Sequence, residues 1–141
     1  MEISVQLYYW HEVMGPLLLY SNGLLEISEE DLMMLFSTIE PYSCTPESSI
    51  LGPKYYNKQI VMTYNRSICD PDANDERLRL MGTDVWCLIS CKEEFELVLL
   101  SIIEIVKIIL DIEFESIEEI SQLDAALGER ATQAIKAVYS R

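Results

Sequence analysis

The order of strand-like and helix-like segments constrains the fold of this chain more than any other feature of the sequence. Two strands come first, over about residues 3–20, and the short connection 12–15 joins them as a hairpin. One amphipathic helix follows, then three strand-like runs, and two helices close the chain. Residues that could perform chemistry are nearly absent from this pattern. The sequence therefore indicates a small scaffold that acts through its surfaces.

Two of the expected strands carry apolar side chains on both faces, which is typical of strands covered by protein on each side. In Ser4–His11 one face carries Val5, Leu7 and Tyr9, and the other carries Tyr8 and Trp10. In residues 77–90 one face carries Val85, Cys87 and Ile89, and the other carries Trp86 and Leu88. We expect this last strand to be central. Residues 59–64 form a further strand, whereas 52–56, with Pro53 and Lys54, suit an edge strand.

The three expected helices begin at recognisable signals. Ser28–Asp31 resembles a capping box that starts the first helix, which ends before Pro41. Residues 93–112 carry large apolar side chains at 13 of 20 positions, and we expect this helix to be buried between the sheet and the last helix. Its charged Glu104 and Lys107 exclude a membrane span. A second capping box, Ser116–Glu119, predicts the start of the last helix. Its expected buried stripe consists of Ile120, Leu123, Leu127, Ala131, Ala134 and Val138.

The charge of the chain restricts the partners that it can attract. With 24 acidic and 10 basic residues among 141, the formal net charge is −14. Nucleic acid and anionic membrane surfaces are held mainly by Lys and Arg, so both are disfavoured as partners. A basic protein surface would instead be steered toward this one. The first residues lack the features of an export signal, so we expect a cytoplasmic protein with reduced cysteines at positions 44, 69, 87 and 91.

The element order and the hairpin sequence LYYWHEVMGPLLLYSN together resemble the longin domain. This domain belongs to the longin/roadblock, profilin-like superfamily, and the resemblance is to its single-domain prokaryotic or trafficking-adaptor type. It covers essentially the whole chain, 1–141, as one domain. The resemblance implies an α+β fold with a five-stranded antiparallel sheet in the order 2-1-5-4-3. One helix would cover one face of this sheet and two helices the other.

The resemblance also implies a class of function. Longin-type domains are typically non-enzymatic platforms for protein–protein interaction, which pair with one another and engage small GTPases or vesicle-trafficking machinery. We therefore expect a homodimer or a longin/roadblock heterodimer, with a small GTPase as a further partner. The sequence shows no heptad segment or membrane anchor after the domain, which disfavours a SNARE role.

The expected pairing surface lies on the first helix and the edge strand. The first helix carries Met33 and Met34 beside its core positions, so its apolar stripe is wider than one packing face needs. Surplus apolar surface of this kind marks interaction sites on soluble proteins. The residues expected to form the interface are Leu32, Met33, Met34, Phe36, Ser37, Lys54, Tyr55 and Tyr56.

Sites for catalysis, cofactors or metals are not expected. The glycines are scattered singly, which excludes a phosphate-binding loop, and no Gly-x-Ser-x-Gly motif is present. Asp70–Asn74 imitates a calcium loop, but Asp75 and Met81 stand where its glycine and closing glutamate belong. The alternative function is a small-ligand or metal-binding protein, or a thiol-dependent one. It would use Cys69, Cys87, Cys91 and His11.

Overall fold

The sheet has the architecture that the resemblance to longin domains implies. The structure is a computed structural model that describes residues 1–11, 14–23, 25–36, 47–68, 76 and 82–139, with only the backbone of Phe36 and Ile120. All strand pairs are antiparallel, and the order β2-β1-β5-β4-β3 confirms the α+β prediction. The strands are β1 (Ser4–His11), β2 (Gly15–Ser21), β3 (Ser49–Tyr56), β4 (Gln59–Ile68) and β5 (Thr83–Lys92).

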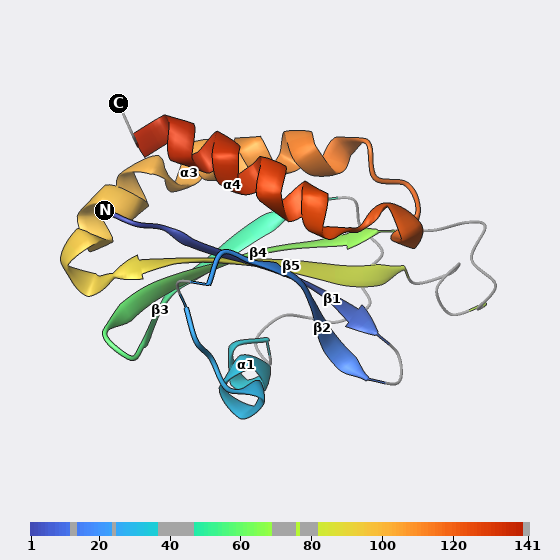
Figure 1. The fold of residues 1–141 in the computed structure, drawn as a ribbon, viewed down its shortest axis with the longest axis horizontal. Helices are drawn as coiled ribbons and strands as arrows, with labels where there is room; N and C mark the ends of the chain where they lie inside the picture. Colours follow the sequence, from blue (N-terminus) through green and yellow to red (C-terminus); the bar gives the residue numbers. More distant parts are fainter. Residues whose placement is uncertain (12–13, 24, 37–46, 69–75, 77–81, 140–141) are drawn as a thin grey trace.

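The helices cover the two faces of this sheet unequally. Helix α1 (Glu29–Phe36) lies alone on one face, whereas α3 (Glu96–Glu115) and α4 (Ala125–Tyr139) lie side by side on the other (Figure 1). Two short 3-10 helices, η1 (Glu93–Phe95) and η2 (Ile120–Gln122), precede α3 and α4. This arrangement confirms the prediction of one helix against two. None of the helices in the described ranges is long and apolar enough to cross a membrane.

Strands β1 and β5 lie inside the sheet and are buried on both faces, as the apolar residues at their successive positions predict. Val5, Leu7, Val85, Cys87 and Ile89 join the larger core beneath α3 and α4. Tyr8, Trp86 and Leu88 join the smaller core beneath α1, where the Trp10 and Trp86 rings meet edge to face. Strand β3 is at the edge, as expected. Its hairpin with β4 turns through Asn57 and Lys58, which both have positive φ, as in a two-residue type I′ turn.

The predicted start of α1 is confirmed, but the predicted start of the last helix is wrong. The Ser28 Oγ accepts a hydrogen bond from the Asp31 amide at 3.2 Å. In contrast, α4 begins at Ala125, and its cap is Asp124, whose Oδ1 accepts from the Leu127 amide at 3.0 Å. The segment Ser116–Glu119 leads only into η2. A sequence that offers two capping signals close together does not show which of them starts the helix.

The buried residues of α4 also differ in part from the predicted ones. Leu123, Leu127 and Ala131 are buried as expected, but Ile135 is fully buried where Ala134 and Val138 were predicted, and these two are only partly buried. Gly128 is also buried, and a Cβ on it would lie 2.5 Å from Tyr20 Cβ. The α4 backbone therefore packs directly on β2.

Candidate interaction surface

Of the residues expected to form the pairing surface, the structure exposes some and buries others in the core. On α1, Met33 and Met34 are 40% and 67% exposed, as a docking surface requires. Leu32, in contrast, is buried with Leu35 against β4 and β5, so it belongs to the core. The Phe36 side chain and Ser37 lie outside the described residues.

The residues of edge strand β3 that were expected to form the interface contact two different helices. Lys54 Nζ donates to the Leu35 carbonyl of α1 at 3.2 Å, and the Tyr56 hydroxyl donates to Asp31 Oδ2 at 2.9 Å. These two bonds attach α1 to the edge of the sheet. The exposed Tyr55 donates instead to Glu96 at the start of α3, and this hydrogen bond raises the pKa of the phenol. Tyr55 therefore borders α3 rather than the methionines of α1.

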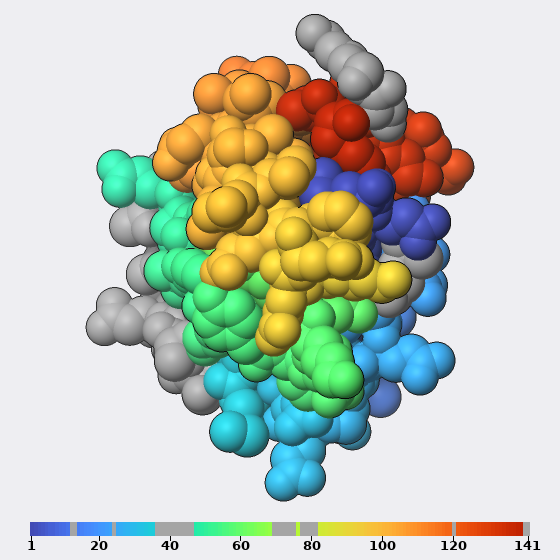
Figure 2. Space-filling model, turned by 90° about the vertical axis from the view of Figure 1, so that its left-hand side faces the viewer, coloured from blue at the N-terminus to red at the C-terminus, as the bar shows by residue number. Residues whose placement is uncertain are grey.

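The largest exposed apolar feature in the described chain lies on α3, where the sequence predicted a buried helix. Its inner face is buried in the main core through Leu99, Val106, Leu110 and Phe114. On its outer face, however, aliphatic side chains are 43–82% exposed. They are Leu97, Val98, Ile105, Ile108 and Ile112, which share one face of the helix and which we call the α3 stripe. The exposed Ser101 lies within this face, one turn from both Leu97 and Ile105. Figure 2 shows α3 at the surface, in yellow and orange, beside the green residues of β3 and β4.

The C-terminal half of the α3 stripe borders an open groove of about 640 Å³. Ile108 and Ile112 line one side of it, together with Asp111, and Ser48 and Arg66 line the other. Asp111 links α3 to the opposite side of the groove, because its Oδ1 accepts hydrogen bonds from Ser48 and, at 2.8 Å, from the buried Tyr64. Its Oδ2 pairs with Lys107 at 3.1 Å. Partial burial acts to raise the pKa of Asp111, but these hydrogen bonds outweigh it and hold that pKa below its usual value.

Acidic side chains dominate the border of the α3 stripe. Exposed Glu104 lies between its apolar residues, Glu115 stands at its C-terminal end, and Glu47 lines the groove. Lys107 is neutralised by Asp111, which leaves Arg66 as the basic residue of the groove outside that pair. The apolar face is thus framed mainly by negative charge.

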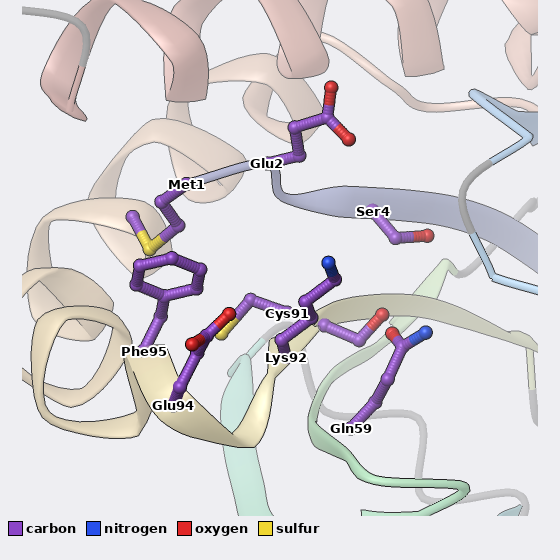
Figure 3. Close-up of a pocket in the computed structure, with 9 residues that line it drawn as sticks. Met1, Glu2, Ser4, Gln59, Cys91, Lys92, Glu94 and Phe95 are labelled. Carbon is purple, nitrogen blue, oxygen red and sulfur yellow. The ribbon is translucent and has the colours of Figure 1, made fainter.

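A second hollow, of about 310 Å³, lies at the end of the sheet where β5 leads into η1. Buried Ser4 and Ser90 line it from the adjacent strands β1 and β5, and Gln59 and Lys92 continue the lining. Glu2, Glu94, Met1 and Phe95 form the rest of its wall, with Cys91 (Figure 3). The sequence did not indicate this hollow, because only the register of three strands brings its polar residues together.

The residues of the alternative thiol or metal function do not converge. His11 ends β1, whereas Cys91 lies beyond the start of that strand, and Cys87 is separately buried in the core. Both cysteines are free thiols, and burial raises the pKa of Cys87 to about 12 and that of Cys91 to about 11. Such thiols stay protonated and poorly nucleophilic at neutral pH. Within the described ranges, no three His, Cys, Asp or Glu side chains are grouped to hold a metal ion.

Cys44, Cys69 and the Asp70–Asn74 segment lie outside the described residues. Comparison with known proteins adds no assignment, since no protein-family model and no curated protein matches the chain. The fold and its surfaces therefore carry the functional argument.

Proposed function

We propose that this protein is a non-enzymatic, longin-type interaction module that docks a different protein chain on the α3 stripe. The observation that carries the proposal is the line of aliphatic residues that α3 turns outward along its length. Globular proteins expose single apolar residues routinely, but several exposed apolar residues gathered on one face and framed by polar residues mark an interaction site. An amphipathic helix laid along the stripe and the adjoining groove is the form of partner that fits best.

The exposed apolar area is large enough to offset much of the free-energy cost of association. The five side chains of the stripe expose the equivalent of about three complete aliphatic side chains, whose burial contributes roughly 4–9 kcal/mol. Association costs on the order of 4–15 kcal/mol in lost freedom. Apolar burial alone therefore comes close to balance, and the charges around the stripe decide which partner binds.

Those charges favour a basic partner over a second copy of the chain. In a two-fold antiparallel pair, the register that sets Leu97 opposite Ile112 also sets Glu94 opposite Glu115 and brings the two Glu104 side chains together. A parallel two-fold pair sets each acid against its own copy. Each copy also carries a net charge of −14. A partner whose apolar face is bordered by Lys or Arg would replace this repulsion with attraction.

The wider role proposed here follows from the longin-like order of elements, now seen in the 2-1-5-4-3 sheet. The partner chain would be a second longin or roadblock protein or a small GTPase, and the assembly would regulate GTPase or trafficking machinery in the cytoplasm. Because proteins of one fold perform many functions, binding of such a partner to the α3 stripe is the test of this role.

Affinity capture from native extract, using wild type, Ile108→Glu and Met34→Glu, tests the proposal. Each captured protein would then be purified and titrated directly against the three forms. We expect a one-to-one complex that weakens at least roughly tenfold with Ile108→Glu and weakens as salt rises, while Met34→Glu leaves it unchanged. Loss of binding with Met34→Glu alone would assign docking to α1 instead. A wild-type dimer in sedimentation that Ile108→Glu dissociates would show a second copy on the stripe.

A pair of synthetic peptides provides a partner-independent test. Both are amphipathic helices with a leucine face, one flanked by lysines and the other by glutamates. Non-specific attraction predicts that Ile108→Glu, which adds a negative charge, binds the lysine peptide more tightly than wild type does. Docking on the stripe predicts the opposite, because the charge interrupts the apolar contact. Fluorescence anisotropy distinguishes the two signs, and tighter binding by the variant refutes docking on the stripe.

A further inference from the structure

We propose that the hollow at the end of the sheet is a binding site for a small zwitterion of the amino-acid class. The lining of this hollow includes two buried serine residues whose hydroxyls lack hydrogen-bond partners. Ser4 and Ser90 are 2% and 0% exposed, and neither Oγ has a hydrogen-bond partner among the described residues. Buried polar atoms in folded proteins nearly always have one, and an unsatisfied one is costly. Both serines line the same hollow, where a ligand could supply the missing partner.

The strand register places these hydroxyls beside further hydrogen-bond donors. Ser4 and Ser90 are directly paired across β1 and β5, so their side chains share one face and their Cβ atoms lie about 4.5–5.5 Å apart. Two residues further along β5, Lys92 is paired with Gln59 of β4 on that same face. Figure 3 shows the Lys92 amine directed toward the side of the hollow formed by Glu2 and Ser4. Two hydroxyls, an amide and an ammonium can each donate a hydrogen bond to the carboxylate of a ligand.

The remaining wall of the hollow suits a positive group and a small apolar one. Glu94 supplies a carboxylate, and the Glu2 carboxylate, which points away from Lys92 and Gln59 in Figure 3, stands at the rim. No ion pair joins either of them to Lys92 in the part of the chain that the structure describes. Met1 and Phe95, which also pack against the main core, supply apolar surface. The two acids disfavour a phosphate or another multiply charged anion. A molecule with one carboxylate, one ammonium and a short side chain fits every part of this lining.

The size of the hollow and its place in the fold agree with such a ligand. Its volume of about 310 Å³ is at the lower end of the usual range for small-molecule sites. The site is separate from the α3 stripe, and the proposal does not rest on the docking of a partner there. Ile108→Glu should therefore leave the binding of a small ligand unchanged, so the two proposals can fail independently.

Titration with L-leucine, followed by amide chemical shifts, tests the site. We expect saturable shifts at millimolar concentration, centred on the residues of the hollow. L-leucinamide and N-acetyl-L-leucine, which each lack one of the two charges, should bind at least roughly tenfold more weakly. Equal binding of all three compounds, or no shift with any proteinogenic amino acid at millimolar concentration, overturns the proposal.

Two variants distinguish a ligand site from an ordinary buried pair of serines. Ser90→Ala removes an unsatisfied hydroxyl, so it should raise the melting temperature of the ligand-free protein while weakening L-leucine binding at least roughly tenfold. Lys92→Met changes an exposed side chain, so the variant protein should fold like wild type. It should weaken L-leucine binding by a similar factor. A Ser90→Ala protein that melts lower and a Lys92→Met protein that binds L-leucine as tightly as wild type would together refute the site.

Discussion

Replacing Gly128 by alanine tests how closely α4 packs on the sheet. In an ordinary exposed helical position this change stabilises a protein by about 1 kcal/mol, because glycine has the higher backbone entropy in the unfolded chain. At Gly128 the new Cβ would lie 2.5 Å from both Cβ and Cγ of Tyr20. The Tyr20 Cβ is fixed to the β2 backbone and cannot rotate away, so α4 and β2 must separate.

Overpacking of this kind costs about 1–3 kcal/mol, occasionally more, and the contact here is more severe than the displacement of a flexible side chain. We therefore expect Gly128→Ala to lower the free energy of unfolding by about 1–3 kcal/mol after the gain in helix propensity is included. The melting temperature should fall by several degrees, as measured by circular dichroism and by urea titration.

Gln133→Ala is the matched control for this measurement. Gln133 is an exposed position of the same helix, so alanine there changes helix propensity without any contact to the sheet. It should leave stability within about 0.5 kcal/mol of wild type. A Gly128→Ala protein as stable as wild type, or more stable, would refute the close packing of α4 on Tyr20.

Two further predictions concern the end of α4 and the groove beside α3. Asp124→Ala removes the cap of α4 and should cost about 1 kcal/mol in urea unfolding, whereas Ser116→Ala, at the capping box predicted from the sequence, should cost less than half as much. Asp111 has a lowered folded pKa, so its contribution to stability is complete above its unfolded pKa of about 4 and is lost as pH falls through the folded value. The stability difference between wild type and Asp111→Asn should therefore shrink from pH 6 toward pH 3, and a difference independent of pH would contradict the hydrogen bonding of Asp111.

The strands were predictable because burial on both faces leaves a pattern in the sequence. Tyr8 and Trp10 alternate with Val5 and Leu7, and each set enters a different core, as the sequence indicates. The start of α4 was not predictable, because Ser116–Glu119 and Asp124 both carry the residue types that cap helices. The role of Gly128 was also hidden, since a helical glycine seen in sequence shows only its propensity cost and not its neighbour across the sheet.

The polar hollow was hidden for a different reason. Ser4, Ser90 and Lys92 are ordinary strand residues in the sequence, where nothing distinguishes them from serines and lysines that face water. They become a set only because β1 pairs with β5 at the register Ser4–Ser90 and β5 pairs with β4 at Lys92–Gln59. A shift of one residue in either pairing would turn these side chains to opposite faces of the sheet. Sites built from strand register therefore require the structure, even where every strand is correctly predicted.

The outward face of α3 shows the limit of periodicity in a helix that is apolar nearly all around. Such a pattern is typical of a buried helix, and the prediction of burial followed from it. A helix packed between a sheet and one neighbouring helix, however, has only two of its sides covered. In α3 Val106 and Leu110 are buried, but Ile105 and Ile108 lie on the uncovered third side. Aliphatic residues on that side either promote aggregation or form a surface that binds another protein. The acidic border of the α3 stripe favours binding of another protein.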